Sequence, residues 1–279
     1  MIARRGFLLA GSAFAVQLRH VLAGDVSRLA FGGALKQGGL VIGTARGASV
    51  KVDGVEVDVS PAGVFAFGLG YDQTRPTSVE VKFPDGKIAL REVLPGVRKY
   101  DVQRVDGLPQ DSVTPPPETR RRIERENAMV AAARMRSTAA TDFVRPFDWP
   151  VKGIVSGWYG SQRIDNGTPM SPHFGIDIAA PANSPIHAPA DGVISLAEPD
   201  FYLTGGTTVI DHGHGVSTVY IHQNELKVAV GASVKRGELI GLVGMKGRAT
   251  GPHLHWGMNW FQMRLDPSLS TATPTPDKA

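Results

Sequence analysis

Short alternations of apolar and polar residues mark the first third of the chain. In SVKVDGVEVDVS (49–60) valines recur at every second position on both sides of Asp53-Gly54, and SVEVKFPDGKIALREV (78–93) repeats the device around Asp85-Gly86. Such alternation around an Asp-Gly pair is typical of a β-hairpin. GVFAFGLGYD (63–72) adds a further short strand. We therefore expect residues 25–112 to form a small antiparallel β-domain of sandwich type, without catalytic groups of its own.

A charged run of helix formers follows this predicted domain. SVTPPPE (112–118) ends the sheet and opens a helix, and ETRRRIERENAMVAAARMRSTAATDF (118–143) contains neither glycine nor proline. These residue types favour a helix, so we predict a linker helix over 113–146. Mixed charges with arginine in excess are typical of a solvated helix; contact with an anionic polymer or a partner protein is the alternative.

From Phe147 onward, glycine and proline interrupt short apolar runs. Examples are GVISLAEP (192–199), TTVIDHGHGVSTVYIH (207–222) and KVAVGASVKRGELIGLVG (227–244). This texture predicts a domain of short strands and tight turns over 147–267. The polar residues 268–279 are expected to form a disordered tail. The chain as a whole is thus expected to be mostly β.

Composition narrows the possible functions. The net charge of +4 is small and locally concentrated, so no nucleic-acid partner is expected. The absence of cysteine excludes disulfides, thiolate metal sites and thiol nucleophiles.

The first residues have the layout of an export signal. MIARRGFLLAGSAFAVQLRHVLAG (1–24) places Arg4 and Arg5 before a short apolar run and small residues, as in a signal peptide. RRGFL resembles the twin-arginine motif, and an ordinary Sec signal is the alternative. We expect export to the periplasm or cell envelope, with no membrane span after signal removal.

Two histidines close together identify the candidate chemistry. In TGPHLHWG (250–257) His253 and His255 are two positions apart, so on a strand both rings face one site. SPHFGIDIAAP (171–181) contributes His173 and Asp177, which a bend at Gly175 can bring together.

Two histidines and a carboxylate with an open fourth position form the ligand set of a hydrolytic zinc site. We therefore predict that Zn²⁺ is held by His173, Asp177 and His255. His253 and His222 remain for proton transfer or for stabilising the developing oxyanion. His222 is expected to share one strand face with Thr218 and Tyr220.

Three motifs in this order resemble the M23 (LytM-type) metallopeptidases over residues 150–267. They are H-x-x-x-D in 173–177, Y-x-H in VYIH (219–222) and GRATGPHLHWG (247–257). SGWYGSQR (156–163) and APADGVI (188–194) are also similar to the family. Gln223 and Trp256-Gly257 depart from its common pattern, outside the five residues of the predicted site.

The resemblance implies a β-rich duplicated hybrid (barrel-sandwich) fold and a zinc enzyme that hydrolyses peptide cross-links of bacterial peptidoglycan. It implies metal binding by His173, Asp177 and His255, with His222 and His253 as catalytic histidines. The partners would be the peptide stems of peptidoglycan and a regulatory or cell-envelope protein. The β-domain before residue 147 is expected to be dispensable for the bond-breaking step, though not for control or localisation.

Other interpretations compete with this one. The chain could be a non-catalytic module that binds peptidoglycan or activates an amidase, although its ligand set is intact. A group carrier is disfavoured, because Lys235 and Lys246 do not lie in the tip sequence that carriers use. We assign no part in the site to three other histidines: His212 and His214 are expected in a turn, and His187 at a strand end.

Overall fold

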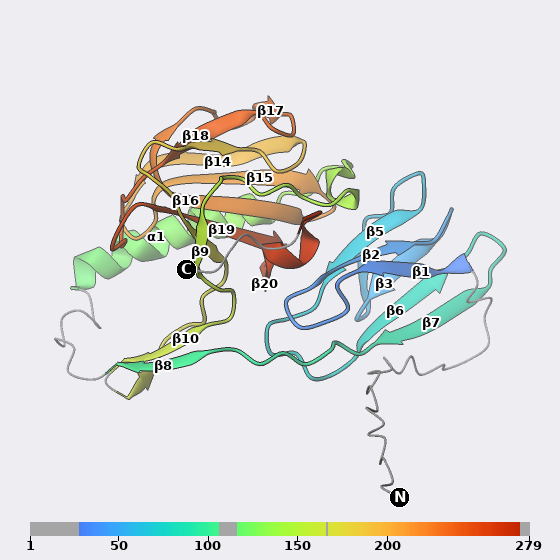
Figure 1. The fold of residues 1–279 in the computed structure, drawn as a ribbon. Coiled ribbons are helices and arrows are strands. Elements are labelled where there is room, and N and C mark those ends of the chain that lie inside the picture. The colour runs from blue at the N-terminus through green and yellow to red at the C-terminus, as the bar shows by residue number, and fades with distance from the viewer. Residues whose placement is uncertain (1–27, 106–115, 166, 274–279) are drawn as a thin grey trace, which may run out of the picture.

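The computed structural model describes residues 28–105, 116–165 and 167–273 (Figure 1). The expected signal peptide, residues 1–24, lies outside these ranges. The prediction of a mostly β chain is confirmed, and the described residues contain one α-helix. No helix in the described ranges is both long and apolar enough to cross a bilayer.

Two small antiparallel sheets form the N-terminal part, coloured blue to green in Figure 1. One sheet has the order β1-β2-β5 and the other β4-β3-β6-β7. Both predicted hairpins are present, and Asp53 and Gly54 have the positive φ angles (47° and 82°) that a tight turn between paired strands requires. Phe65 and Phe67 of one sheet and Val79 of the other belong to one shared apolar core. The strands are β1 (Ala30–Gly33), β2 (Leu40–Thr44), β3 (Ser49–Val52), β4 (Val55–Val57), β5 (Val64–Gly68), β6 (Thr77–Lys82) and β7 (Ile88–Val93).

Helix α1 (Pro117–Arg134) is shorter than predicted and is not a free linker. It ends at Arg134, where the amides of Met135 and Arg136 bond back to the carbonyls of Ala132 and Ala133. Beyond this end, Thr138 O accepts from the His214 N–H at 3.0 Å. Val130 and Ala133 of the helix pack in a small apolar cluster with Val219 of the C-terminal sheet. The helix therefore covers one face of that sheet.

A ten-stranded sheet dominates the C-terminal part. Its main path runs β17-β14-β15-β16-β19-β12-β9, with β13, β18 and β20 paired beside it. The strands are β9 (Ile154–Gly157), β12 (Ile176–Ala179), β13 (Pro185–His187), β14 (Gly192–Phe201), β15 (Gly205–Gly213), β16 (Val216–Leu226), β17 (Ser233–Val234), β18 (Leu239–Val243), β19 (His253–Trp260) and β20 (Met263–Leu265).

The main core lies on one face of this sheet. Ile176, Trp256 and Tyr220 pair across three adjacent strands, so their side chains point to the same side. All three are fully buried. The residues next to these three along their strands must point to the opposite face of the sheet. Helix α1 packs on that opposite face.

A small sheet joins the two parts of the chain. Strand β8 (Val102–Val105) runs parallel to β10 (Gln162–Asp165), which pairs with β11 (Thr168–Pro169). Figure 1 shows β8 and β10 side by side, away from the large sheet. A largely buried ion pair between Arg98 and Asp266, at 2.8 Å, makes a second link.

The prediction that a disordered tail begins at residue 268 is wrong. Residues Pro267–Ser270 form a short 3₁₀ helix (η4), because the Asp266 carboxylate accepts from the Ser268 N–H and so caps its start. Thr271 then forms a β-bridge with Phe147. A second 3₁₀ turn, η3 (Asp142–Val144), precedes the first strand of the domain. Residues 274–279 lie outside the described ranges.

Candidate metal centre

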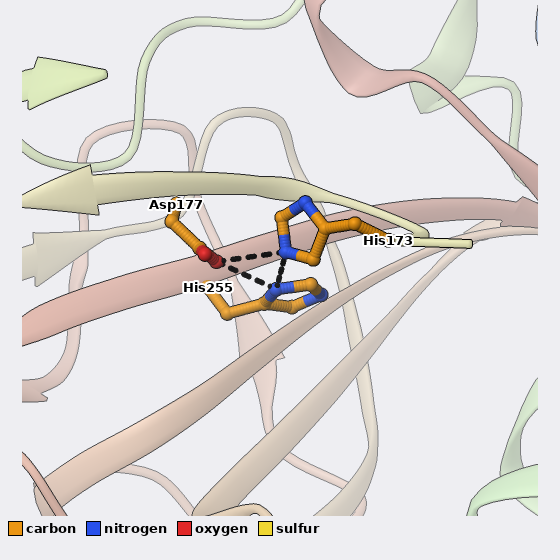
Figure 2. Close-up of side chains that lie close together, drawn as sticks. All are labelled: His173, Asp177 and His255. Carbon is orange, nitrogen blue, oxygen red and sulfur yellow. Dashed lines mark hydrogen bonds and ion pairs between the residues drawn. The ribbon is translucent and has the colours of Figure 1, made fainter. Parts of the chain in front are cut away.

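Two paired strands and one loop bring together His173, Asp177 and His255 (Figure 2). Asp177 on β12 and His255 on β19 are direct partners in the antiparallel ladder, so both side chains leave the sheet on the same face. His173 comes from the loop just before β12. The Asp177 Oδ1 atom lies 2.8 Å from His255 Nδ1 and 3.0 Å from His173 Nε2, and the two nitrogens are 2.9 Å apart.

Two glycines leave the space that this cluster occupies. A Cβ atom added to Gly175 would lie 2.6 Å from His255 Cε1, and one added to Gly157 would lie 2.5 Å from Asp177 Oδ2. Gly175 is not among the residues with a positive φ angle. The expected bend is therefore not what requires glycine here; the close approach of the His255 ring is.

Hydrogen bonds fix which nitrogen of His173 faces the cluster. His173 Nδ1–H donates to the Trp158 carbonyl at 3.1 Å, which leaves Nε2 as the nitrogen directed at Asp177. A second partner of this kind holds a ligand ring in one tautomer and orientation.

The protonation states suit a cation. Burial opposes ionisation of Asp177, but hydrogen bonds and charge from His173 and His255 outweigh it and hold the pKa of Asp177 far below its usual range. Burial lowers the pKa of His255. Burial also acts to lower the pKa of His173, yet its bond to Asp177 raises it overall. The Asp177 carboxylate is therefore ionised at neutral pH, the form in which a carboxylate binds a cation.

The donor set fits zinc on chemical grounds. Three donor atoms from two imidazoles and one carboxylate converge from two strands and a loop, and each side chain is only partly exposed. This is the composition of catalytic zinc sites, which keep one position for water or substrate.

His253 and His222 lie beside the cluster. Their rings are 4.7 Å apart, and His253 Nε2 is 4.0 Å from Asp177 Oδ1. His253 Nδ1–H donates to the Gly251 carbonyl and His222 Nδ1–H to the Lys246 carbonyl, both at 2.8 Å. When either ring is neutral, this bond places its proton on Nδ1 and leaves Nε2 as the acceptor nitrogen. Burial lowers the pKa of His222 to about 4.

The expected common face of Thr218, Tyr220 and His222 is wrong for His222. Thr218 Oγ1 and Tyr220 Oη bond to each other at 2.8 Å in the core. His222 has φ +65°, a left-handed conformation that breaks the period of two. Its ring consequently turns to the opposite face, toward His253. Strand β16 does neighbour β19, as the prediction required.

The other histidines form no second cluster with His, Asp or Glu among the described residues. His212 is not in a turn but fully buried in β15, bonded to Asp191 O at 2.7 Å and Thr218 Oγ1 at 2.8 Å. His214 is buried against Phe143. His187 ends β13, as expected.

Sequence reasoning missed the residues that support the cluster. The Trp158 carbonyl and Gly157 carry no side-chain signal of their own, although SGWYGSQR stood out as similar to the family. Of the two departures, Trp256 points into the core and Gln223 Nε2 donates to Thr208 Oγ1, so both lie in the packed interior rather than in the cluster.

Comparison with known proteins agrees with this geometry. Residues 171–267 match the family model of Peptidase family M23. The crystal structure described as peptidase M23 from Pseudomonas aeruginosa superposes with a TM-score of 0.65 at 29% identity, covering 84% of this chain and 93% of that one. The fold and the cluster are thus those of a metallopeptidase domain. Specifically, residues 171–267 form a peptidase M23 domain.

Curated relatives share this domain. The DD-carboxypeptidase/endopeptidase Mpg of Neisseria meningitidis serogroup B is 43% identical over 106 residues, and the peptidoglycan DD-endopeptidase ShyA of Vibrio cholerae is 41% identical over 106 residues. Each alignment covers 38% of this chain and 24% of the relative. The similarity therefore concerns the domain, about a quarter of each relative's length.

Proposed function

We propose that this protein is a zinc-dependent endopeptidase that hydrolyses peptide cross-links of bacterial peptidoglycan. The observation that carries the proposal is the convergence of His173, Asp177 and His255 on one sheet face, with the rings of His222 and His253 beside them. Of the two relatives described above, one is named a DD-carboxypeptidase/endopeptidase and the other a peptidoglycan DD-endopeptidase, so a D,D peptide bond is the proposed target.

The three clustered residues would hold the metal through His173 Nε2, Asp177 Oδ1 and His255 Nδ1. When bound, zinc supplies Lewis acidity toward the scissile carbonyl and makes water a better nucleophile near neutral pH. The ionised state of Asp177 and the carbonyl-bonded tautomer of His173 prepare these atoms for that role.

His253 and His222 would transfer the proton between the attacking water and the leaving amine. Each has Nδ1–H bound to a backbone carbonyl, so each presents a basic Nε2 atom. A ring so placed can accept a proton from attacking water and return it to the amine of the leaving peptide. Once protonated, the same ring can donate a hydrogen bond to the developing oxyanion. The pKa of His222, lowered to about 4 by burial, keeps its ring neutral at pH 7.

We further propose that the protein acts in the periplasm or cell envelope, which is where its substrate lies. The arginine-led apolar start of the sequence supports export. A regulatory or cell-envelope protein partner is part of the same proposal.

Digestion of purified sacculi tests the proposal. The zinc-loaded full chain should convert cross-linked muropeptide dimers into monomers without cutting glycan, as read by mass spectrometry. Removing the metal with a chelator should stop the reaction, and adding zinc should restore it. The matched variant Asp177→Asn, which removes the charge at nearly constant volume, should be inactive. Unchanged dimers after treatment with a zinc-loaded chain would favour the non-catalytic, peptidoglycan-binding or amidase-activating alternative.

A further inference from the structure

The residue that holds His173 in place is itself held by the N-terminal part of the chain. His173 makes three hydrogen bonds to the segment Trp158–Ser161: Nδ1–H to Trp158 O at 3.1 Å, its amide to Ser161 O at 2.8 Å, and its carbonyl from the Gly160 N–H at 2.8 Å. The position of the segment Trp158–Ser161 therefore determines the position of both the ring and the backbone of His173.

Tyr71, which follows β5 of the N-terminal sandwich, reaches this segment. Its hydroxyl donates to the Gly160 carbonyl at 3.1 Å, across 89 positions of sequence. The Tyr71 ring also packs edge-on against Phe174, the residue next to His173, with ring centroids 5.8 Å apart. Tyr71 thus contacts both the segment that bonds to His173, at Gly160, and the chain neighbour of His173, Phe174.

Tyr100 packs against both Tyr71 and Gly160. The two tyrosine rings stack with centroids 4.3 Å apart, and the Tyr100 hydroxyl donates to the Tyr71 carbonyl at 3.1 Å. A Cβ atom at Gly160 would overlap the Tyr100 ring, and Gly160 has φ +87°, which favours glycine. The amide of Gln162 donates to Asp101 O at 2.9 Å and continues the contact into the β8–β10 ladder.

We infer that Tyr71 is a positioning residue for the metal centre: through Gly160 it sets the place of His173. The inference rests on the proposed function insofar as His173 is taken to bind zinc. It gives the N-terminal β-domain a part in building the site, although that domain contributes no catalytic group. The sequence alone led to the opposite expectation, that this domain is dispensable for bond breaking.

The test compares Tyr71→Phe with Tyr202→Phe in the full chain. Tyr71→Phe keeps the ring stack and removes only the hydroxyl that bonds to Gly160. Tyr202, whose ring lies near Arg122 of helix α1, supplies the matched control. One readout is zinc affinity by competition with a chromophoric chelator. The other is amide hydrogen exchange of Gly160 and His173 in metal-free protein.

Tyr71→Phe should weaken zinc binding about 3- to 10-fold, less than the roughly 10- to 100-fold typical of losing a ligand's direct hydrogen-bond partner. Exchange of the two amides should quicken about fivefold, as expected for one lost hydrogen bond. Tyr202→Phe should match the parent chain in both. A Tyr71→Phe chain that melts earlier but keeps its zinc affinity would show a merely structural role and overturn the inference. If the parent chain binds no zinc, the proposed function fails, while unchanged exchange at His173 in Tyr71→Phe would still refute the positioning.

Discussion

Substitution of Gly175 by alanine should disrupt the metal centre although it replaces none of the proposed ligands. The added Cβ would lie 2.6 Å from His255 Cε1 and 2.7 Å from the Trp256 carbonyl. Ordinary contact begins at 3.4 Å and the Nε2 atom of the same ring lies closer still, so the His255 ring must move by about 1 Å. Zinc–ligand distances tolerate only about 0.2 Å. We expect zinc affinity to fall about 100-fold or more, and overpacking to cost about 1–3 kcal/mol of folding stability.

Zinc titration against a competing chelator measures the effect, with thermal unfolding of the metal-free chains alongside. Gly251→Ala is the matched control, because a Cβ there has no neighbouring atom within 4 Å and Gly251 is also not among the positive-φ residues. If Gly175→Ala binds zinc as tightly as Gly251→Ala does, the close approach of His255 to the Gly175 backbone is not what shapes the site.

Three further outcomes follow from the same geometry. His255→Ala should lose zinc, whereas His253→Ala should keep it and lose about 10²- to 10⁴-fold in turnover; equal zinc loss in both would contradict the assigned roles. His222→Ala should retain zinc and fold, lose most turnover, and bind a phosphinate transition-state mimic less well; unchanged turnover would remove it from the mechanism. Burial lowers the pKa of His212 to about 4, so the folded state binds fewer protons than the unfolded state and stability should fall as pH drops from 6.5 toward 4. Urea unfolding should show that the free energy of unfolding falls by up to about 3 kcal/mol over that pH range. If its dependence on pH is the same in His212→Gln, another group causes the fall.

Local sequence patterns were sufficient for much of the site. A period of two correctly predicted that His253 and His255 face the same side of a strand. The expectation that a bend at Gly175 brings His173 and Asp177 together is confirmed, because Gly175 lies in a bend and His173 Nε2 is 3.0 Å from Asp177 Oδ1. Both relations concern residues at most four positions apart, so local backbone geometry was sufficient to predict them.

Features that depend on distant packing could not be predicted in this way. His222 reaches the site only because its backbone is left-handed, and an isolated histidine in an apolar run carries no signal of that conformation. Helix α1 ends at Arg134, and the Thr138 carbonyl beyond it accepts from His214 in the turn between β15 and β16, a contact 76 positions away in sequence. The contact of Tyr71 with Gly160 joins segments 89 positions apart, so neither segment's own pattern indicates it.

Metal analysis of the full chain measures directly whether the three-residue cluster holds zinc. We expect one zinc ion per chain after mild purification, and none in a His173→Ala variant that retains the parent's β-rich circular dichroism spectrum. A folded parent chain that takes up no zinc, or a His173→Ala variant that binds it as tightly as the parent, would contradict the claim that His173, Asp177 and His255 form the metal centre.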